Sequence, residues 1–142
     1  MNTNKLLLGT LAGAIVNFFA GWALYALVFK GLMESNLSDT AKSIMLPEDQ
    51  HNILYYFISG LFMSLAMAII YERWANIRTL QTGAIAGAII SVCISLGFDF
   101  QFLASTNFYS SFTMVIINAF MSALMGALTG GAIGWMLGYN RA

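Results

Sequence analysis

The chain has 142 residues, of which 59% are apolar and only 8% are charged. A soluble domain carries about 25% charged residues, so this composition excludes an ordinary water-soluble globule and favours a protein that lies in lipid. Six basic residues balance six acidic ones, which excludes the strongly basic surface typical of nucleic-acid binding. The single cysteine, Cys93, lies in an apolar run, where it indicates neither a disulfide framework nor a cluster of metal ligands.

Four uncharged segments are long enough to cross a bilayer, over residues 6–29, 53–71, 79–98 and 112–138. A span needs about 20 apolar residues, and in hydrocarbon a helix satisfies all of its backbone groups within one segment. We therefore predict one all-α transmembrane domain, a four-helix bundle. The first segment is longer than the apolar core of a signal peptide, which makes cleavage the less favoured interpretation.

The basic residues predict how the bundle is oriented. Lys5, Arg73, Arg78 and Arg141 belong to the termini and to the turn between the second and third spans, whereas the loop over residues 30–52 holds two lysines. Because lysine and arginine accumulate on the cytoplasmic side, we predict that both termini are cytoplasmic. Glu72 lies in the same turn, where we expect a surface ion pair with a neighbouring arginine.

The external loop over residues 30–52 is the one sizeable polar segment. Ser38 is a candidate N-cap for a short helix, which we expect to lie at the membrane interface. The segment PEDQ, from Pro47, is typical of a helix start, since proline suits the first position and acidic residues suit the first turn. This pattern predicts that the second long helix begins near Pro47, outside the bilayer.

Short repeats suggest that the chain consists of two similar helical hairpins. AGAI occurs at residues 12–15 and again at 86–89, and FMS occurs at 62–64 and again at 120–122. Each hairpin would contain two spans, so both would insert in the same direction, as in a parallel repeat. Chance similarity between helices rich in alanine and glycine is the alternative explanation.

Every predicted span carries small residues four positions apart. In lipid, helices associate through close backbone approach, which small residues permit. Residues four apart also drift around a helix, so the stripe over residues 126–138 can face two different neighbours, one of them in a second copy of the chain. The residues at which we expect close helix packing are Gly9, Gly13, Gly21, Gly60, Ser64, Gly83, Gly87, Gly126, Gly130, Gly134 and Gly138.

A second set of residues forms a candidate polar site in the outer half of the bundle. A carboxylate inside a membrane is a candidate proton or cation site, but the shallow predicted depth of Asp99 favours an interfacial acid that reaches water or caps a neighbouring helix. The amides and hydroxyls have two interpretations, a small-molecule or ion site between the hairpins and plain interhelical hydrogen bonding. The candidate residues are Asn17, Tyr25, Ser91, Ser95, Asp99 and Asn118.

Nothing in the sequence predicts catalysis or a bound cofactor. There is no nucleophile with a neighbouring base, no phosphate-binding loop and no paired-cysteine motif. His51 lies near Glu48 and Asp49, but so small a set of ligands does not make a metal site. We therefore expect no catalytic residue, no cofactor and no metal.

Three segments, AGWALYALVFKGLM, LGFDFQF and FTMVIINAFMSALMGALTGGAIGW, suggest a family. They resemble the end of the first helix, the end of the third helix and the glycine-rich fourth helix of a bacterial four-helix integral membrane family of unknown function. The resemblance covers most of the chain. It implies a small protein of the bacterial inner membrane, with no established activity, substrate or site.

Two functions are compatible with these patterns. The leading hypothesis is a non-enzymatic structural or accessory membrane protein, packed tightly through its small residues and associating with itself or with another membrane protein. The alternative is a subunit of a small-molecule or ion transporter or channel, with its polar site around Asn17, Asp99 and Asn118. In both cases the surroundings are membrane lipids, and nucleic acid is not a partner.

Overall fold

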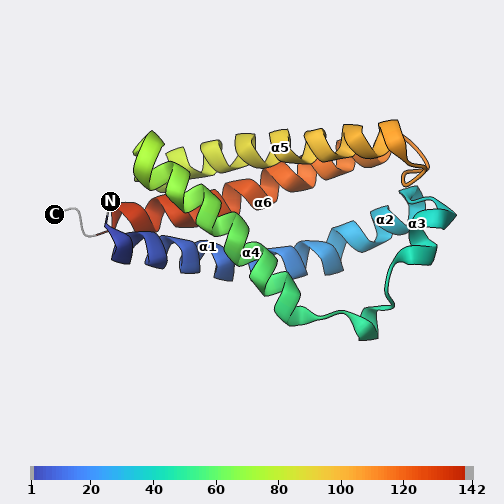
Figure 1. The fold of residues 1–142 in the computed structure, drawn as a ribbon, viewed down its shortest axis with the longest axis horizontal. Coiled ribbons are helices and arrows are strands. Elements are labelled where there is room, and N and C mark those ends of the chain that lie inside the picture. The colour runs from blue at the N-terminus through green and yellow to red at the C-terminus, as the bar shows by residue number, and fades with distance from the viewer. Residues whose placement is uncertain (1, 140–142) are drawn as a thin grey trace.

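The computed structural model describes residues 2–139, which are helical apart from turns and connecting segments and contain no β-strand (Figure 1). Four continuous helical segments, Thr3–Asn36, Ile53–Ala75, Leu80–Ser105 and Thr113–Gly138, are long and apolar enough to cross a membrane. Large apolar side chains stay exposed along all four of them. The prediction of an all-α protein with four long apolar helices is therefore confirmed, and these helices are consistent with a small membrane protein.

The first helical segment runs past its predicted end at residue 29. Helix α1 (Thr3–Leu24) passes through a π-helical turn (Tyr25–Phe29) into α2 (Lys30–Asn36) without a break. The π-helical turn absorbs a local irregularity while the backbone stays hydrogen-bonded, and no proline interrupts the segment. The helix ends only where Leu37 becomes extended, so the predicted loop is wrong for residues 30–36.

The segment before the second long helix confirms one cap and corrects another. Ser38 caps the short helix α3 (Asp39–Ile44), since its hydroxyl accepts a hydrogen bond from the Ala41 amide at 3.1 Å. Pro47 precedes only a single 3-10 turn (Glu48–Gln50), after which the chain is extended again. Helix α4 (Ile53–Ile69) begins instead after Asn52, whose side chain accepts from the Leu54 amide at 3.0 Å. The Asn52 side chain accepts a hydrogen bond from an amide at the start of the helix, whereas the proline side chain has no acceptor atom. The predicted helix start near Pro47 is therefore wrong.

The second half of the chain forms two long helices. Helix α4 continues into a π-helical turn (Ile70–Ala75) and ends at Asn76, which adopts the left-handed conformation with φ of 48°. Thr79 caps α5 (Leu80–Ser105), which extends past the predicted boundary at residue 98 because nothing between Phe98 and Ser105 breaks a helix. Helix α6 (Thr113–Gly138) agrees closely with its predicted span.

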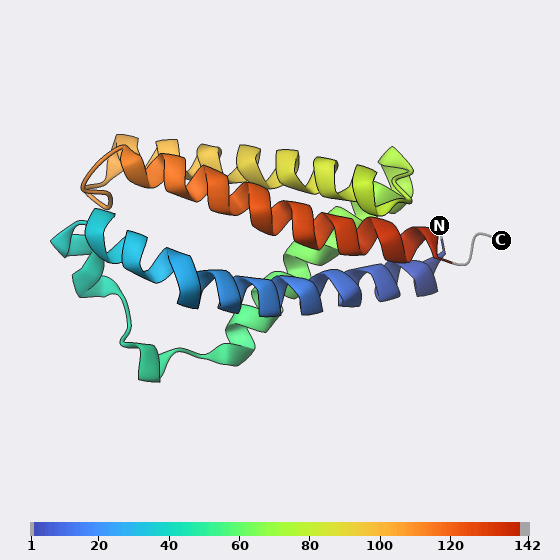
Figure 2. The same ribbon diagram turned by 180° about the vertical axis from the view of Figure 1, so that it is seen from behind.

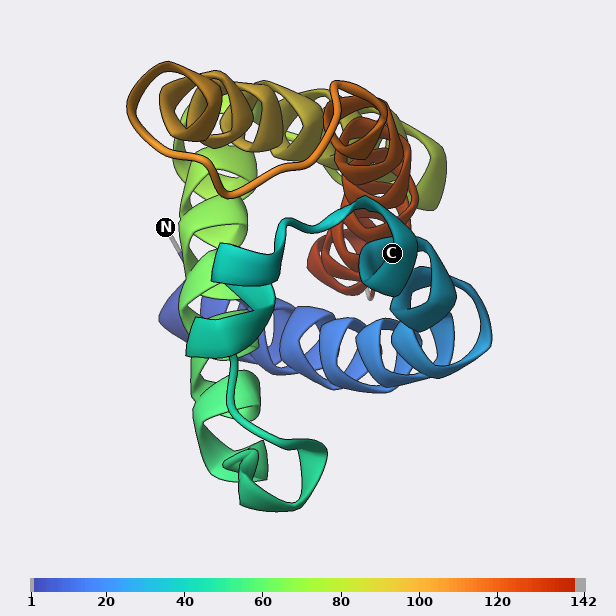
Figure 3. The same cartoon turned by 90° about the vertical axis from the view of Figure 1, so that its right-hand side faces the viewer.

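The helices surround a common axis but pack unequally. Helices α5 and α6 lie antiparallel and side by side along their length, whereas α4 runs diagonally across α1 (Figures 1 and 2). Seen along the bundle, α4 and α6 occupy opposite sides, between α5 and α1 (Figure 3). The two hairpins therefore pack differently, and their common origin stays a prediction.

The two ends of the bundle also differ. One end, here called the terminal end, holds residues 2 and 139 and the turn over residues 76–79 (Figure 1). The other, here called the loop end, holds α2, α3 and the loop over residues 106–112. Tightly packed side chains gather toward the terminal end, where the buried cluster consists of Leu6, Met67, Ala68, Tyr71, Ile133 and Leu137.

Glycines bring the backbones of α5 and α6 into direct contact. A Cβ atom added to Gly87 would collide with the Gly126 carbonyl, and one added to Gly126 would collide with the Gly87 carbonyl. Gly83 and Gly130 oppose each other in the same way. Further along α6, a Cβ at Gly134 would meet the Thr79 carbonyl. At Gly138 it would meet the Arg78 carbonyl, so α6 from Gly126 onward lies directly against the backbone of α5 and the turn before it.

The small residues of α1 and α4 also have neighbours within the chain. Gly9 faces Leu137, and a Cβ at Gly13 would lie 2.6 Å from an Ile133 carbon and 2.9 Å from the Ser64 hydroxyl. The side chain of Asn17 occupies the space where a Cβ atom of Gly60 would lie, and Gly21 faces the Met125 methyl group. Among the described residues, the small-residue positions thus contact other helices of the same chain.

The glycine contact predicts opposite outcomes for two alanine substitutions in α5. Gly87→Ala places a methyl group against the Gly126 carbonyl, so we expect the free energy of unfolding to fall by about 1–3 kcal/mol, as for an overpacked core. Gly97 has open space around its Cβ position, so Gly97→Ala should leave stability unchanged or raise it by up to about 1 kcal/mol. Unfolding in mixed micelles by an anionic detergent measures both. Equal stability of the two variants would contradict the contact.

Candidate polar site at the loop end

The carboxyl group of Asp99 is buried although the chain is poor in charge. Asp99 lies within α5, and its residue surface is only 4% exposed. The sequence left open a shallow acid that reaches water. In the bundle the Asp99 side chain is enclosed by its neighbours, since α5 continues beyond it to Ser105, while its depth in a bilayer stays a prediction. Burying a carboxylate is costly unless hydrogen bonds or an opposite charge compensate for the lost water.

Three neutral side chains donate hydrogen bonds to this carboxylate. Ser95, one turn earlier on α5, donates to Oδ2 at 3.1 Å. The Tyr109 hydroxyl donates to Oδ1 at 2.5 Å, and the Asn118 amide donates to the same oxygen at 2.8 Å. The Asn118 amide also lies 3.1 Å from the Tyr109 hydroxyl. The network therefore joins α5, the loop after it and α6 around one acid.

Tyr109 reaches Asp99 because the loop over residues 106–112 is attached to the end of α2. Leu37 and Tyr109 form an isolated antiparallel bridge, in which the Ser38 amide donates to the Phe108 carbonyl at 3.1 Å. The Ser110 amide donates to the Asn36 carbonyl at 3.0 Å. Burial and the hydrogen bond to Asp99 both raise the pKa of Tyr109 above its usual value, so the phenol keeps its proton and remains a donor.

Sequence reasoning did not identify Tyr109 as a site residue. Tyr109 lies among many aromatic residues near the ends of the predicted spans, and tryptophan and tyrosine favour the membrane surface in general. The chain between Asp99 and Tyr109 leaves the helix, so no helical periodicity predicts that the two side chains lie close together. A useful signal was the segment STNFYSS over residues 105–111, whose serine and asparagine residues are typical of a turn and indicate a tight return between α5 and α6.

No ion pair among residues 2–139 involves Asp99. At the loop end, Lys30 and Glu48 are 2.7 Å apart and exposed, and Lys30 holds the pKa of Glu48 below its usual value. At the terminal end, Glu72 pairs with Arg78, and their side chains are only 5% and 17% exposed. The predicted surface pair at Glu72 is therefore largely buried. Asp99 differs from Glu72, because its charge is compensated by neutral donors.

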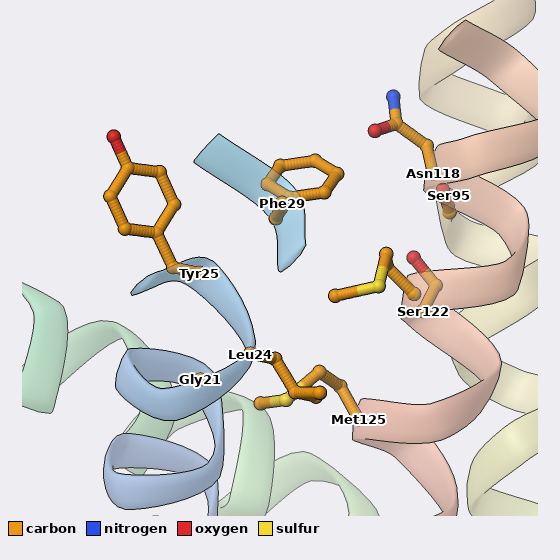
Figure 4. A pocket seen from close by; sticks show the side chains of 9 residues that line it. Gly21, Leu24, Tyr25, Phe29, Ser95, Asn118, Ser122 and Met125 are labelled. Carbon is orange, nitrogen blue, oxygen red and sulfur yellow. The ribbon is translucent and has the colours of Figure 1, made fainter. Parts of the chain in front are cut away.

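Two crevices adjoin this network, and together they are lined by all six predicted site residues. The larger crevice, of about 400 Å³, lies between α1, α4, α5 and α6 and includes Asn17, Ser91, Ser95 and Asp99 in its lining. The smaller crevice, of about 220 Å³, includes Tyr25, Ser95 and Asn118 (Figure 4). Four α6 residues that the sequence did not indicate as site residues also line them: Ser122 and Met125 line both crevices, Met121 only the smaller one and Thr129 only the larger one.

The six predicted residues do not form a single cluster. Ser95, Asp99 and Asn118 are hydrogen-bonded together, whereas Asn17 donates to the Thr129 hydroxyl at 3.3 Å on the other side of the larger crevice. Ser91 lies between these groups along α5 and faces Gly126. The Tyr25 hydroxyl points away from Asn118 and Ser122, so Tyr25 contributes its ring and not its hydroxyl (Figure 4).

This arrangement suits binding and offers little for catalysis. A carboxylate and several hydroxyl and amide groups face a crevice whose remaining wall is apolar, which is the usual composition of a ligand site. Residues 2–139 contain no group of three or more His, Cys, Asp or Glu side chains that could hold a metal ion. Within that part of the chain, Asp99 is therefore the one acid of the larger crevice and the natural partner for a positive charge.

Comparisons with family models, with curated proteins and with solved structures found no match to this chain. The resemblance to a bacterial four-helix family therefore stays an expectation from the segments AGWALYALVFKGLM, LGFDFQF and FTMVIINAFMSALMGALTGGAIGW.

The hydrogen bond from Tyr109 predicts a measurable loss on its removal. Tyr109→Phe leaves the buried carboxylate with two donors, so we expect the free energy of unfolding to fall by about 1–3 kcal/mol. Tyr55→Phe is the matched control, because Tyr55 is 69% exposed at the start of α4 and should be neutral. Detergent-induced unfolding, followed by circular dichroism, gives both values. A Tyr109→Phe protein as stable as the control would show that the bond contributes nothing.

Proposed function

We propose that the chain is an integral membrane protein that binds a small polar or charged solute at its loop end, as a subunit of a small-molecule or ion transporter or channel. The observation that carries the proposal is Asp99, a buried carboxylate on the wall of a 400 Å³ crevice, held by neutral donors. Ionisable groups inside membrane segments are costly, and they commonly mark solute or proton pathways.

The packing of the small residues bears on the choice between the two functions. The glycine stripe on α6 was the main argument for self-association, and its members contact α5, Thr79 and Arg78 of the same chain. Packing within the chain thus accounts for these glycines without a second copy. A structural or accessory role stays the second candidate, supported by the exposed apolar side chains at the start of α4, such as Ile53 and Leu54.

The proposal includes an orientation in the bacterial inner membrane. Lys5, Arg73 and Arg78 belong to the terminal end, while Arg141 lies outside the described residues. The loop end carries Lys30 and Lys42 beside an excess of acids. The larger number of basic residues supports a cytoplasmic terminal end, with the Asp99 crevice in the outer half of the bilayer.

The transport function predicts solute flux that depends on Asp99. Purified protein in liposomes should admit at least one of radiolabelled sodium, rubidium or methylammonium faster than protein-free liposomes do. Asp99→Asn keeps the size of the side chain but removes its charge, so the flux should fall by about tenfold or more, equivalent to roughly 1.4 kcal/mol.

Asp39→Asn is the matched control for this measurement. Asp39 is an exposed acid at the start of α3, outside both crevices, so its substitution should leave the flux unchanged. If none of the three probes crosses faster than in protein-free liposomes, the transport function is contradicted and the accessory role becomes the better explanation.

The orientation can be tested separately by cysteine labelling. In a Cys93→Ser background, Ala75→Cys introduces a thiol at the terminal end and Asn107→Cys introduces one at the loop end, both at exposed positions. In intact cells an impermeant maleimide should label the cysteine at position 107 and not the one at 75. After the cells are lysed, the maleimide should label the cysteines at both positions. The reverse pattern would show that the termini face outward.

A further inference from the structure

We propose that the larger crevice binds a small amphipathic amine, with its ammonium group at Asp99 and its apolar body against the methionines of α4 and α6. This inference deepens the proposed function, on which it rests for the role of the crevice, by naming the chemical class of the ligand. It follows from the free acceptor positions of the carboxylate, from the composition of the crevice wall and from its volume.

The carboxylate of Asp99 has an acceptor position that the protein does not use. Two oxygens provide about four lone-pair positions, of which Tyr109 and Asn118 occupy two on Oδ1 and Ser95 occupies one on Oδ2. The fourth position is available to a donor in the crevice. Because the three protein donors are neutral, a cationic donor would add the Coulomb attraction that the site lacks.

Hydroxyl groups near Asp99 can receive the other protons of an ammonium group. The lining of the larger crevice includes the hydroxyl of Ser95, which donates to Asp99, and that of Ser122, one turn along α6 from Asn118, and a hydroxyl that donates one hydrogen bond can still accept others. A primary ammonium has three donors, so a carboxylate with neighbouring hydroxyls fits its needs. A quaternary ammonium has none and would use only the charge.

The rest of the wall favours an apolar body over a bare inorganic ion. Met63 and Met67 of α4, Met125 of α6, and Ile94 and Phe98 of α5 form most of this surface. Methionine is flexible and polarisable and adapts to apolar ligands of different shape, while an aromatic face attracts a cation. A bare metal ion would instead need several oxygen ligands at one point.

Two further observations restrict the chemical class of the ligand. A volume of about 400 Å³ is within the range of small-molecule sites and exceeds the needs of a single ion. The lining of both crevices contains no lysine or arginine, so nothing there would compensate for a phosphate group. The ligand is therefore a free amine and not the ammonium of a phosphatidylethanolamine headgroup, which carries a phosphate beside it.

The experiment compares two ligands of nearly equal size in nanodiscs of phosphatidylcholine. Radiolabelled phenethylamine supplies an ammonium group on an aromatic body, and 2-phenylethanol replaces the ammonium with a neutral hydroxyl. We expect the full chain to bind the amine at least about tenfold more tightly than the alcohol, which corresponds to roughly 1.4 kcal/mol. Asp99→Asn should remove this preference, and the Asp39→Asn control should keep it.

Two further measurements distinguish a free amine from a lipid headgroup and test the apolar part of the crevice. Replacing part of the phosphatidylcholine with phosphatidylethanolamine should leave amine binding unchanged, and competition by the lipid would overturn the assignment to a free amine. Met63→Trp fills the apolar part of the crevice, so it should weaken phenethylamine more than methylammonium. This variant also tests the proposal if Asp99→Asn does not fold.

The binding result and the flux result can fail independently. Equal affinity for the amine and the alcohol, or an unchanged preference in Asp99→Asn, overturns the amine inference even if sodium or rubidium flux supports a transporter. Conversely, amine binding that depends on Asp99, without flux of any probe, supports the inference and contradicts the transport function.

Discussion

The direct contact between the backbones of α5 and α6 is the constraint on which the rest of the bundle depends. Gly83 and Gly87 oppose Gly130 and Gly126 with no side chain between them. This approach lets the Tyr71 hydroxyl, in the π-helical turn after α4, donate to the Gly83 carbonyl at 2.7 Å. In lipid, such close approach replaces the hydrophobic force that joins helices in water.

Tight packing at one end has a consequence at the other. Helix α4 is fixed near the terminal end by Met67, Ala68 and Tyr71, and it crosses α1 diagonally as it runs toward the loop end (Figures 1 and 3). Its first turns therefore diverge from α5. The crevices lie in this less densely packed half, which is also where the polar side chains of α5 and α6 meet.

The two buried acids of the bundle are compensated in different ways. Glu72 pairs with Arg78 inside the terminal end and also accepts a hydrogen bond from the backbone N–H of Asn2 at 3.3 Å. This pair closes the turn between α4 and α5 with its charges balanced. Asp99 is held by Ser95, Tyr109 and Asn118, which stabilise the carboxylate without neutralising it. A carboxylate held only by neutral donors has no opposite charge beside it and can bind an incoming cation, which makes Asp99 rather than Glu72 the candidate site.

The sequence by itself determined the number and approximate positions of the long helices. The length and hydropathy of a segment are local properties, and each can be compared directly with the thickness of a bilayer. It also indicated the small-residue positions and the polar residues of the loop-end site. It placed helix ends less well: residues 30–36 and 99–105 are helical because no residue there breaks a helix, and Asn52 rather than Pro47 supplies the cap.

Only the tertiary structure decided which small residues face each other, that Asp99 is buried, and that Tyr109 binds it. These facts depend on the angle between α4 and α1 and on the loop that joins Leu37 to Tyr109. Such contacts connect residues far apart in the chain, and their geometry is fixed by packing of the whole bundle. No local periodicity contains that information.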